Sequence, residues 1–320
     1  MTRPPAPVPI LTGPTGSGKS TWAERLGEEW PVEIVSVDSA LVYRGMDIGT
    51  AKPSAALRAR IPHHLIDILD PAQAYSAGQF VTDAQAAIAA IRERGRIPLL
   101  VGGTMLYLRA LREGLAALPV ASREVRRDID ARAARQGWPA LHAELARLDP
   151  EAAARIHPND PQRIQRALEV CTVSGRPLSE LQRTAQRGGG ERFVSWGLAP
   201  ERATLHAALE ARLARMMGQG FLEEVTKLHA RGDLTPMHPA VRAVGYRQLW
   251  AHLDGRCGLA DATARALAAT RQLAKRQFTW MRAQPDLRRI EPADPQAYVR
   301  WKCELRRELA GASQAPGGSW

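Results

Sequence analysis

Short apolar runs alternate with helical patterns in the first third of the chain. Residues 8–12, 32–37 and 97–101 are apolar runs of strand length, and residues 77–94 carry apolar side chains at helical spacing. Strands that alternate with helices predict a parallel sheet with both faces covered, which is an α/β fold. The three runs end in Gly, Asp, Ser or Thr. Because ligands of such sheets bind beyond the carboxyl ends of the strands, these ends predict a single site.

The pattern changes near residue 120. Strand-like runs disappear, helices rich in Ala, Arg and Glu replace them, and Asp160 followed by Pro161 predicts a helix start. A strand pattern returns at 193–198. We therefore predict an α/β core interrupted by a small all-helical domain. The predicted divisions are a first part of the core at 1–119, a helical insertion at 120–190, a return to the core with C-terminal helices at 191–310 and a loose tail at 311–320.

The first apolar run leads into a phosphate-binding loop, Gly-x-x-x-x-Gly-Lys-Ser, with a helical pattern after it. Backbone N–H groups of such a loop surround a phosphate, Lys19 adds a positive charge, and the Ser20 hydroxyl can hold Mg²⁺. We therefore expect a P-loop NTPase-like, nucleotide-binding type of core, such as ATP-binding proteins have, with Mg²⁺ as cofactor. The residues predicted to bind a di- or triphosphate are Gly13, Pro14, Thr15, Gly16, Ser17, Gly18, Lys19 and Ser20.

The acid expected of an ATP-hydrolysing enzyme is missing after the most apolar run. Such an enzyme holds Mg²⁺ with an acidic residue there, but residues 97–101 are followed by Gly102, Gly103 and Thr104. The acid that is present, Asp38, follows the second run. It could orient Mg²⁺, accept a proton from an incoming nucleophile, or cap the next turn. The sequence leaves these three interpretations open.

Charge and composition narrow the class of protein only partly. The 44 Lys and Arg against 33 Asp and Glu give a net charge of +11, which suits nucleic acid, anionic lipid or a polyanionic small substrate. No apolar run approaches the roughly 18 residues of a membrane helix, and early prolines argue against a signal peptide. Three cysteines without C-x-x-C spacing predict neither a disulfide framework nor a zinc site. We expect a cytoplasmic enzyme that does not contact a membrane.

Five segments together resemble the bacterial tRNA dimethylallyltransferase family, in order along residues 8–310. They are the loop at 13–20, the unusual Ser-Val-Asp-Ser-Ala-Leu-Val-Tyr-Arg-Gly-Met-Asp-Ile-Gly-Thr-Ala-Lys-Pro at 36–53, and the segments 101–107, 159–169 and 243–250. The resemblance implies transfer of a dimethylallyl group from dimethylallyl diphosphate to N6 of the adenine adjacent to the anticodon. The phosphate loop would then hold a leaving group, which fits the missing acid.

The resemblance also implies roles for three residues near that loop. The N6 amine is a poor nucleophile, and Asp38 is the candidate general base, worth a factor of ~10²–10⁴. Thr104 would lie near the reacting centre and donate to a diphosphate oxygen. Arg212 would contact the diphosphate, although its position also fits an exposed charge on a helix.

The tRNA partner is implied by the resemblance together with rows of basic residues. A base inside the anticodon loop must leave its stack to react, which requires anchors on the anticodon stem-loop. Each basic row could equally be a solvated surface, Tyr246 could stack or simply pack, and the row at 271–282 rests on its pattern. A monomer is expected. The predicted tRNA-binding residues are Asp38, Ser39, Ala40, Leu41, Thr104, Arg126, Gln162, Arg163, Ile164, Gln165, Arg166, Arg242, Ala243, Val244, Gly245, Tyr246, Arg247, Lys275 and Arg282.

Two other functions stay open from the sequence. An adenylate isopentenyltransferase of the same fold would make a free cytokinin and would have little use for a basic helical insertion. A P-loop small-molecule kinase or an RNA-binding ATPase would carry an acid after residues 97–101. The basic rows and the missing acid therefore favour the tRNA-modifying prenyltransferase.

Overall fold

The computed structural model describes residues 5–116, 118–184 and 190–311. The chain divides into two compact units, which we call the core unit (Met1–Leu108 with Glu191–Trp320) and the helical unit (Arg109–Gly190). The sequence had placed the start of the helical insertion at residue 120. Most of the predicted tail at 311–320 lies outside the described residues.

One parallel sheet forms the centre of the core unit, as the alternation of strands and helices predicts. Its strand order is β3-β2-β4-β1-β5-β6, and all neighbours pair in parallel. The four strands expected from the sequence are confirmed, while the two short outer strands were not predicted. The strands are β1 (Val8–Thr12), β2 (Val32–Val37), β3 (His63–His64), β4 (Ile97–Gly102), β5 (Phe193–Leu198) and β6 (Arg288–Ile290).

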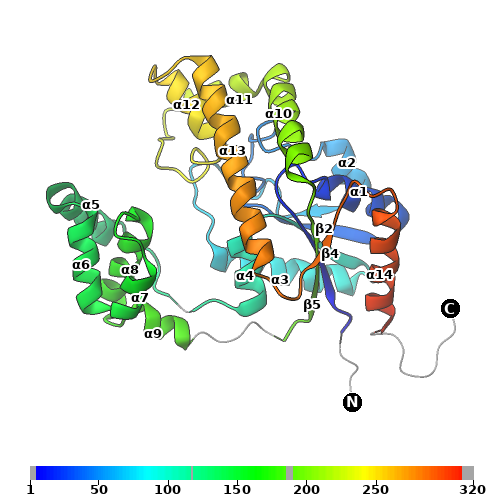
Figure 1. The fold of residues 1–320 in the computed structure, drawn as a ribbon, viewed down its shortest axis with the longest axis horizontal. Coiled ribbons are helices and arrows are strands. Elements are labelled where there is room, and N and C mark those ends of the chain that lie inside the picture. Colours follow the sequence, from blue (N-terminus) through cyan, green and yellow to red (C-terminus); the bar gives the residue numbers. More distant parts are fainter. Residues whose placement is uncertain (1–4, 117, 185–189, 312–320) are drawn as a thin grey trace. The chain divides into compact units, whose positions relative to one another are not determined.

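Helices cover both faces of this sheet (Figure 1). Helices α1 (Lys19–Glu29) and α14 (Ala297–Gly311) bury Leu26 and Trp301 against one face, with Trp196 of β5 between them. Helix α3 (Ala77–Glu93) contacts β2 and β4 and lies outside that cluster, on the opposite face. Helix α2 (Ala55–Arg60) precedes β3. The observed α3 confirms the helix expected at 77–94.

Four further helices of the core unit lie beyond the carboxyl ends of the strands (Figure 1). Together with the segment around Tyr43 and Met46 they form a second apolar cluster, and Leu209 of α10 packs near Ala274 of α13. The strand ends and these helices therefore face each other across the edge at which a ligand is expected. The helices are α10 (Arg202–Gly218), α11 (Phe221–His229), α12 (Tyr246–Leu253) and α13 (Leu259–Arg282).

The helical unit is a bundle with its own apolar core, which includes Ile129, Leu141 and Leu168. Asp160 caps helix α8, because its carboxylate accepts the N–H of Arg163 at 3.1 Å. This confirms the predicted helix start. The helices are α4 (Met105–Glu113), which begins in the core unit, α5 (Arg123–Gln136), α6 (Trp138–Leu148), α7 (Pro150–Arg155), α8 (Pro161–Ser174) and α9 (Leu178–Arg183).

Candidate active site

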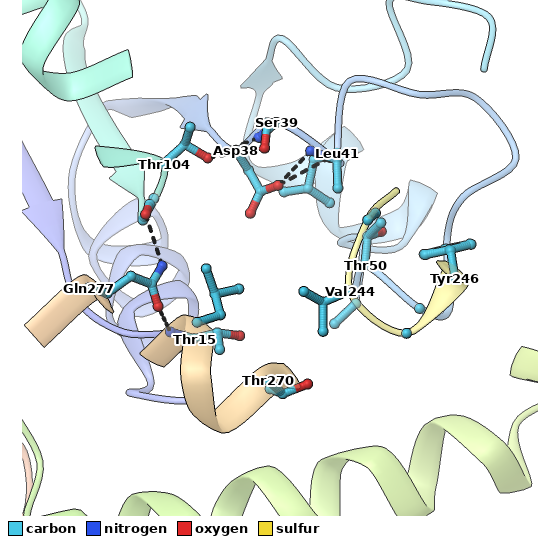
Figure 2. Close-up of a pocket in the computed structure, with 18 of the residues that line it drawn as sticks. Thr15, Asp38, Ser39, Leu41, Thr50, Thr104, Val244, Tyr246, Thr270 and Gln277 are labelled. Carbon is cyan, nitrogen blue, oxygen red and sulfur yellow. Dashed lines mark hydrogen bonds between the residues drawn. The ribbon is translucent and has the colours of Figure 1, made fainter. Parts of the chain in front are cut away.

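A cavity of about 790 Å³ lies in the core unit, between the strand ends and helices α10 and α13. Its wall combines the phosphate loop, the residues after β2 and β4, the segment 49–51 and the segment 242–246. Figure 2 shows Asp38, Thr104 and Gln277 on one side of the cavity and Val244 and Tyr246 on another. The strand ends therefore contribute to a single site, as their sequences predict.

The phosphate loop has left-handed glycines where the chain must turn sharply. Gly16 has φ +80 and Gly18 has φ +87, and a Cβ at Gly16 would stand 2.8 Å from Leu209 of α10. Only glycine adopts these angles without strain. The turn brings the start of α1, with Lys19 and Ser20, to the cavity wall, so that α1 presents its N-terminal end there.

Lys19 is held close to the other charged groups of the cavity. Its Nζ donates to the carbonyl of Pro14 at 3.3 Å. Burial lowers the pKa of Lys19 to about 8; the Asp38 carboxylate opposes this shift and the Arg212 guanidinium adds to it. Arg242 and Arg276 also line the cavity, so that four cationic side chains share it with the Asp38 carboxylate, which leaves it net positive and suited to an anionic ligand.

Asp38 both caps a turn and lines the cavity. One carboxylate oxygen, Oδ1, accepts the N–H groups of Ala40 at 2.8 Å and Leu41 at 3.3 Å. The capping role left open by the sequence is therefore present. Figure 2 shows the carboxylate directed into the cavity, where it can also meet a ligand.

Thr104 connects the end of β4 with the end of β2. Its Oγ1 accepts the N–H of Ser39 at 3.1 Å, and its own N–H donates to the Val37 carbonyl at 3.1 Å. A Cβ on Gly102 would stand 2.1 Å from the Val37 carbonyl oxygen, so the two strand ends can approach this closely only because residue 102 is glycine. Thr104 and Asp38 thus occupy neighbouring positions in the cavity wall.

Arg212 projects from α10 into the cavity, so it is not an ordinary exposed helix charge. One guanidinium nitrogen donates to the Thr50 carbonyl at 3.4 Å. Burial lowers the pKa of Arg212, and the Asp38 carboxylate opposes that shift. The residue is placed to contact the same anion as Lys19.

Helix α13 contributes a row of cavity residues that the sequence reasoning missed. Thr270, Leu273, Gln277 and Trp280 recur at helical spacing and line the wall, together with Arg276. This spacing is the signal that could have identified them. The two α13 residues that were predicted instead, Lys275 and Arg282, are exposed and outside the cavity lining.

The segment 242–246, which is predicted to bind tRNA, lines the cavity. Tyr246 packs and does not offer a free ring for stacking. Its side chain is buried, lies against Phe221 with ring centroids 5.0 Å apart, and donates its hydroxyl to Glu224 at 2.5 Å. Arg247 is exposed and outside the cavity lining.

The predicted tRNA-binding residues of the helical unit have different surroundings. Arg126 and Arg166 both pair with the fully buried Glu169, at 2.9 and 2.6 Å. Arg163 is exposed, and Gln165 donates to Asp130 at 2.6 Å. Gln162 is exposed on the same helix.

The prediction for Ile164 is wrong at the level of its side chain. Ile164 is completely buried on the inner face of α8, in the apolar core of the helical unit. A side chain in that position cannot reach a nucleic acid. Packing in the core of the helical unit explains why residue 164 is apolar.

The oxygen donors of the cavity suit Mg²⁺. The Ser20 hydroxyl and the Asp38 carboxylate both line it, and Mg²⁺ prefers oxygen ligands from one or two side chains together with substrate phosphates. Among the described residues there is no cluster of three or more His, Cys, Asp or Glu side chains that could hold a metal by itself. A magnesium ion here would therefore depend on a bound phosphate.

The fold and the cavity define a class of phosphate-loop α/β protein whose cavity, at the end of a parallel sheet, suits an anionic group beside a carboxylate. Residues 41–284 match the sequence profile of the IPP transferase family. The chain belongs to this family, the tRNA dimethylallyltransferases, which are prenyltransferases that modify tRNA.

Curated relatives are similar along nearly the whole chain. The tRNA dimethylallyltransferase of Bordetella petrii is 59% identical over 285 residues, covering 88% of this chain and 91% of the relative. That of Ralstonia nicotianae is 54% identical over 308 residues, covering 92% and 95%.

Solved structures agree with the fold. The tRNA isopentenylpyrophosphate transferase of Bacillus halodurans is 34% identical, with a TM-score of 0.71 and coverage of 96% of this chain and 98% of that one. A eukaryotic dimethylallyltransferase acting on tRNA is 26% identical, with a TM-score of 0.81 and coverage of 98% and 81%. The α/β fold expected from the sequence is confirmed. Among the residues that the structure describes, no helix has the length and apolar character to span a bilayer.

Proposed function

We propose that this protein acts in the cytoplasm, as a monomer, on dimethylallyl diphosphate and tRNA. It transfers the dimethylallyl group to N6 of the adenine adjacent to the anticodon and releases diphosphate. The observation that supports this most directly is that Asp38, Lys19 and Arg212 line one cavity, so that a carboxylate and two cations could act on the same ligand.

The reaction needs one bond to form as another breaks. The N6 nitrogen attacks the allylic carbon, the carbon–oxygen bond to diphosphate breaks, and the N6 proton passes to the Asp38 carboxylate. Lys19, Arg212 and the N–H groups of the phosphate loop stabilise the negative charge that develops on the leaving diphosphate. Mg²⁺, held through the Ser20 hydroxyl and the diphosphate oxygens, would supply further charge neutralisation there.

Binding of the target base requires it to leave the anticodon stack. Arg242 and the segment 243–246, which are predicted to bind tRNA, line the cavity. Arg276 and Trp280 of α13 line the same wall. A cation and an aromatic ring are suited to a backbone phosphate and a base, respectively. The wall can therefore hold the extruded nucleotide beside Asp38.

One transfer assay separates this function from the two alternatives. The protein is incubated with labelled dimethylallyl diphosphate and, separately, with unmodified tRNA, AMP or ATP. Label that enters tRNA supports the proposal. Label that enters only AMP indicates an adenylate isopentenyltransferase, and ATP hydrolysis without transfer indicates a kinase or ATPase.

The base is tested with Asp38→Asn. Asparagine keeps an oxygen that can accept the N–H groups of Ala40 and Leu41, so the turn is preserved while the proton acceptor is removed. We expect kcat to fall by about 10²–10⁴, with the Kd for tRNA within about threefold of the wild-type value. A kcat within tenfold of wild type would show that Asp38 is not the base.

A further inference from the structure

Gln277 is a buried glutamine that joins two distant parts of the cavity wall. Its Oε1 accepts the N–H of Thr15 in the phosphate loop at 2.9 Å, and its Nε2 donates to the carbonyl of Gly103 after β4 at 2.8 Å. Figure 2 shows this bridge along one side of the cavity. The residue is 5% exposed, the bond to Gly103 is buried and the bond to Thr15 is partly buried.

The two ends of the bridge belong to the two halves of the proposed reaction. Thr15 is part of the loop that would hold the leaving diphosphate. Gly103 directly precedes Thr104, whose hydroxyl accepts the N–H of Ser39 beside Asp38. A fixed bridge between them therefore fixes the spacing between the leaving group and the proton acceptor.

The glycine at position 103 leaves room for the Gln277 side chain. A Cβ on Gly103 would stand 2.3 Å from Gln277 Nε2 and 3.0 Å from the Gly13 carbonyl oxygen. A residue with a side chain at position 103 would therefore push the amide away. The amide carries no net charge, so it adds no charge attraction for the diphosphate, and one of its N–H groups and its oxygen are engaged by the two partners.

We propose that Gln277 is a positioning residue that sets the distance between the phosphate loop and the Thr104–Asp38 side of the cavity. The proposal rests on the proposed function. Loss of the bridge would leave each half able to bind its own part of the substrates. The reacting atoms would then be misaligned, and a displacement of about 1 Å can cost about 10²-fold in rate.

Two substitutions test the bridge, with a matched control on the same helix. Gln277→Met keeps the length of the side chain and removes both hydrogen bonds. Gln277→Glu keeps an acceptor for Thr15, but its carboxylate cannot donate to the Gly103 carbonyl. Gln272→Glu changes an exposed glutamine on α13. Rates are expressed per folded molecule, counted by tRNA binding.

The expected result is a loss of kcat without a matching loss of binding. Both Gln277 variants should lower kcat by about 30- to 100-fold at pH 8. Gln277→Met should keep the Kd values for tRNA and for inorganic diphosphate within threefold of wild type, and Gln277→Glu should do so at pH 6, where its neutral form is favoured. Gln272→Glu should match the wild type in all three measurements.

Gln277→Glu has a further signature in its pH profile. When the introduced carboxyl is protonated, it can accept from Thr15 and donate to Gly103 as the amide does, and burial favours that neutral form. Its kcat relative to wild type at the same pH should therefore rise several-fold between pH 8 and pH 6. Gln277→Met has no titratable group there, and its relative kcat should stay flat.

A different outcome would overturn the inference. A kcat within threefold of wild type in both variants, or losses confined to KM, would show that the bridge does not set the reaction geometry. An equal pH response of the two variants would do the same. Transfer of label by the wild-type protein in the same assay keeps this failure distinct from a failure of the proposed function.

Discussion

Lys19 shows how its surroundings change the pKa of one residue proposed to bind diphosphate. It lies between the carbonyl of Pro14, the Asp38 carboxylate and the Arg212 guanidinium. Burial and Arg212 favour its neutral form and Asp38 favours its charged form, and the balance lowers its pKa to about 8. Near neutral pH the amine is still charged, but it holds its proton much less firmly than an exposed lysine does.

Diphosphate affinity should therefore fall at alkaline pH. Below pH 8 the Lys19 ammonium is present and attracts the anion; above pH 8 each pH unit removes about nine-tenths of the remaining charged form. If only the charged form binds, the Kd for inorganic diphosphate should rise about tenfold from pH 7 to pH 9. Isothermal titration calorimetry at several pH values measures this rise.

The matched control is Lys19→Arg, whose guanidinium stays charged throughout this range. The Kd of the variant for diphosphate can differ from that of the wild type, but it should not rise further above pH 8. Because protonation of diphosphate affects both proteins equally, the comparison isolates the contribution of Lys19. Parallel pH curves for the two proteins would show that Lys19 does not titrate at the site.

Site residues in strand-end motifs could be predicted from the sequence. Site residues that hydrogen-bond to the backbone of residues far away in the sequence could not. Asp38 directly follows an apolar strand, Thr104 follows another after one glycine, and Lys19 ends the loop after the first strand, so their positions place them at one edge of the sheet. Gln277 bonds to Thr15, 262 positions away, and its partner is a backbone N–H that leaves no trace in the sequence. A polar residue on a helix is by default expected on the surface.

At the scale of elements, helix α11 organises the segment 46–53. The carboxylate of Glu224 accepts three successive backbone N–H groups, from Asp47 and Ile48 at 2.7 Å and Gly49 at 3.1 Å. The segment bends so tightly that Ala51, a non-glycine residue, has φ +52, which costs energy unless its neighbours hold it. Glu224 thereby fixes one wall of the cavity.

Replacement of this carboxylate should loosen the wall. In Glu224→Gln an NH₂ group replaces one accepting oxygen, so at least one backbone N–H loses its acceptor, at a cost of about 1–3 kcal/mol in unfolding free energy. Because Thr50, which accepts from Arg212, follows directly in the segment, we also expect a higher KM for dimethylallyl diphosphate. Urea unfolding and steady-state kinetics measure the two effects.

Glu223→Gln is the control for this substitution, because Glu223 is the exposed neighbour on the same helix. It should change the unfolding free energy by less than about 0.5 kcal/mol. If Glu224→Gln behaves like this control, the three hydrogen bonds do not hold the segment.

The length of an element decided whether it could be predicted. Strands β1, β2, β4 and β5 have five or six residues and are almost entirely buried, which gives them clear apolar runs. Strands β3 and β6 have two and three residues and polar sequences, His-His and Arg-Arg-Ile. They exist because a neighbouring strand offers hydrogen bonds, and that depends on tertiary structure.

At the scale of the whole molecule, the net charge of +11 does not act as eleven free charges. In the helical unit, Arg126 and Arg166 share one carboxylate, that of the buried Glu169. Two positive charges and one negative charge leave a net +1 for the cluster. Such a cluster can offer a phosphate the charge of one arginine at most.

The pairing of Arg126 and Arg166 with one carboxylate changes the expected salt dependence of tRNA binding. Each phosphate contact contributes about 0.7–0.9 to the slope of log Kd against log salt concentration. We expect Arg242→Gln and Arg247→Gln each to lower that slope by up to about one unit. Arg126→Gln and Arg166→Gln should each remove up to about one unit when made alone, because either one leaves the cluster with Glu169 neutral, and the double substitution should remove no more than that one unit. Arg307→Gln, an exposed residue of α14 on the covered face of the sheet, should leave the slope unchanged.

Filter binding of an anticodon stem-loop from 50 to 300 mM salt provides the measurement. An affinity that does not vary with salt would exclude arginine–phosphate contacts as the basis of tRNA binding. A loss of two units in the double variant would mean that both arginines contact phosphates and that RNA displaces them from Glu169. Because a buried carboxylate without a partner is costly, that second result would also require Glu169 to become protonated or hydrated when tRNA binds.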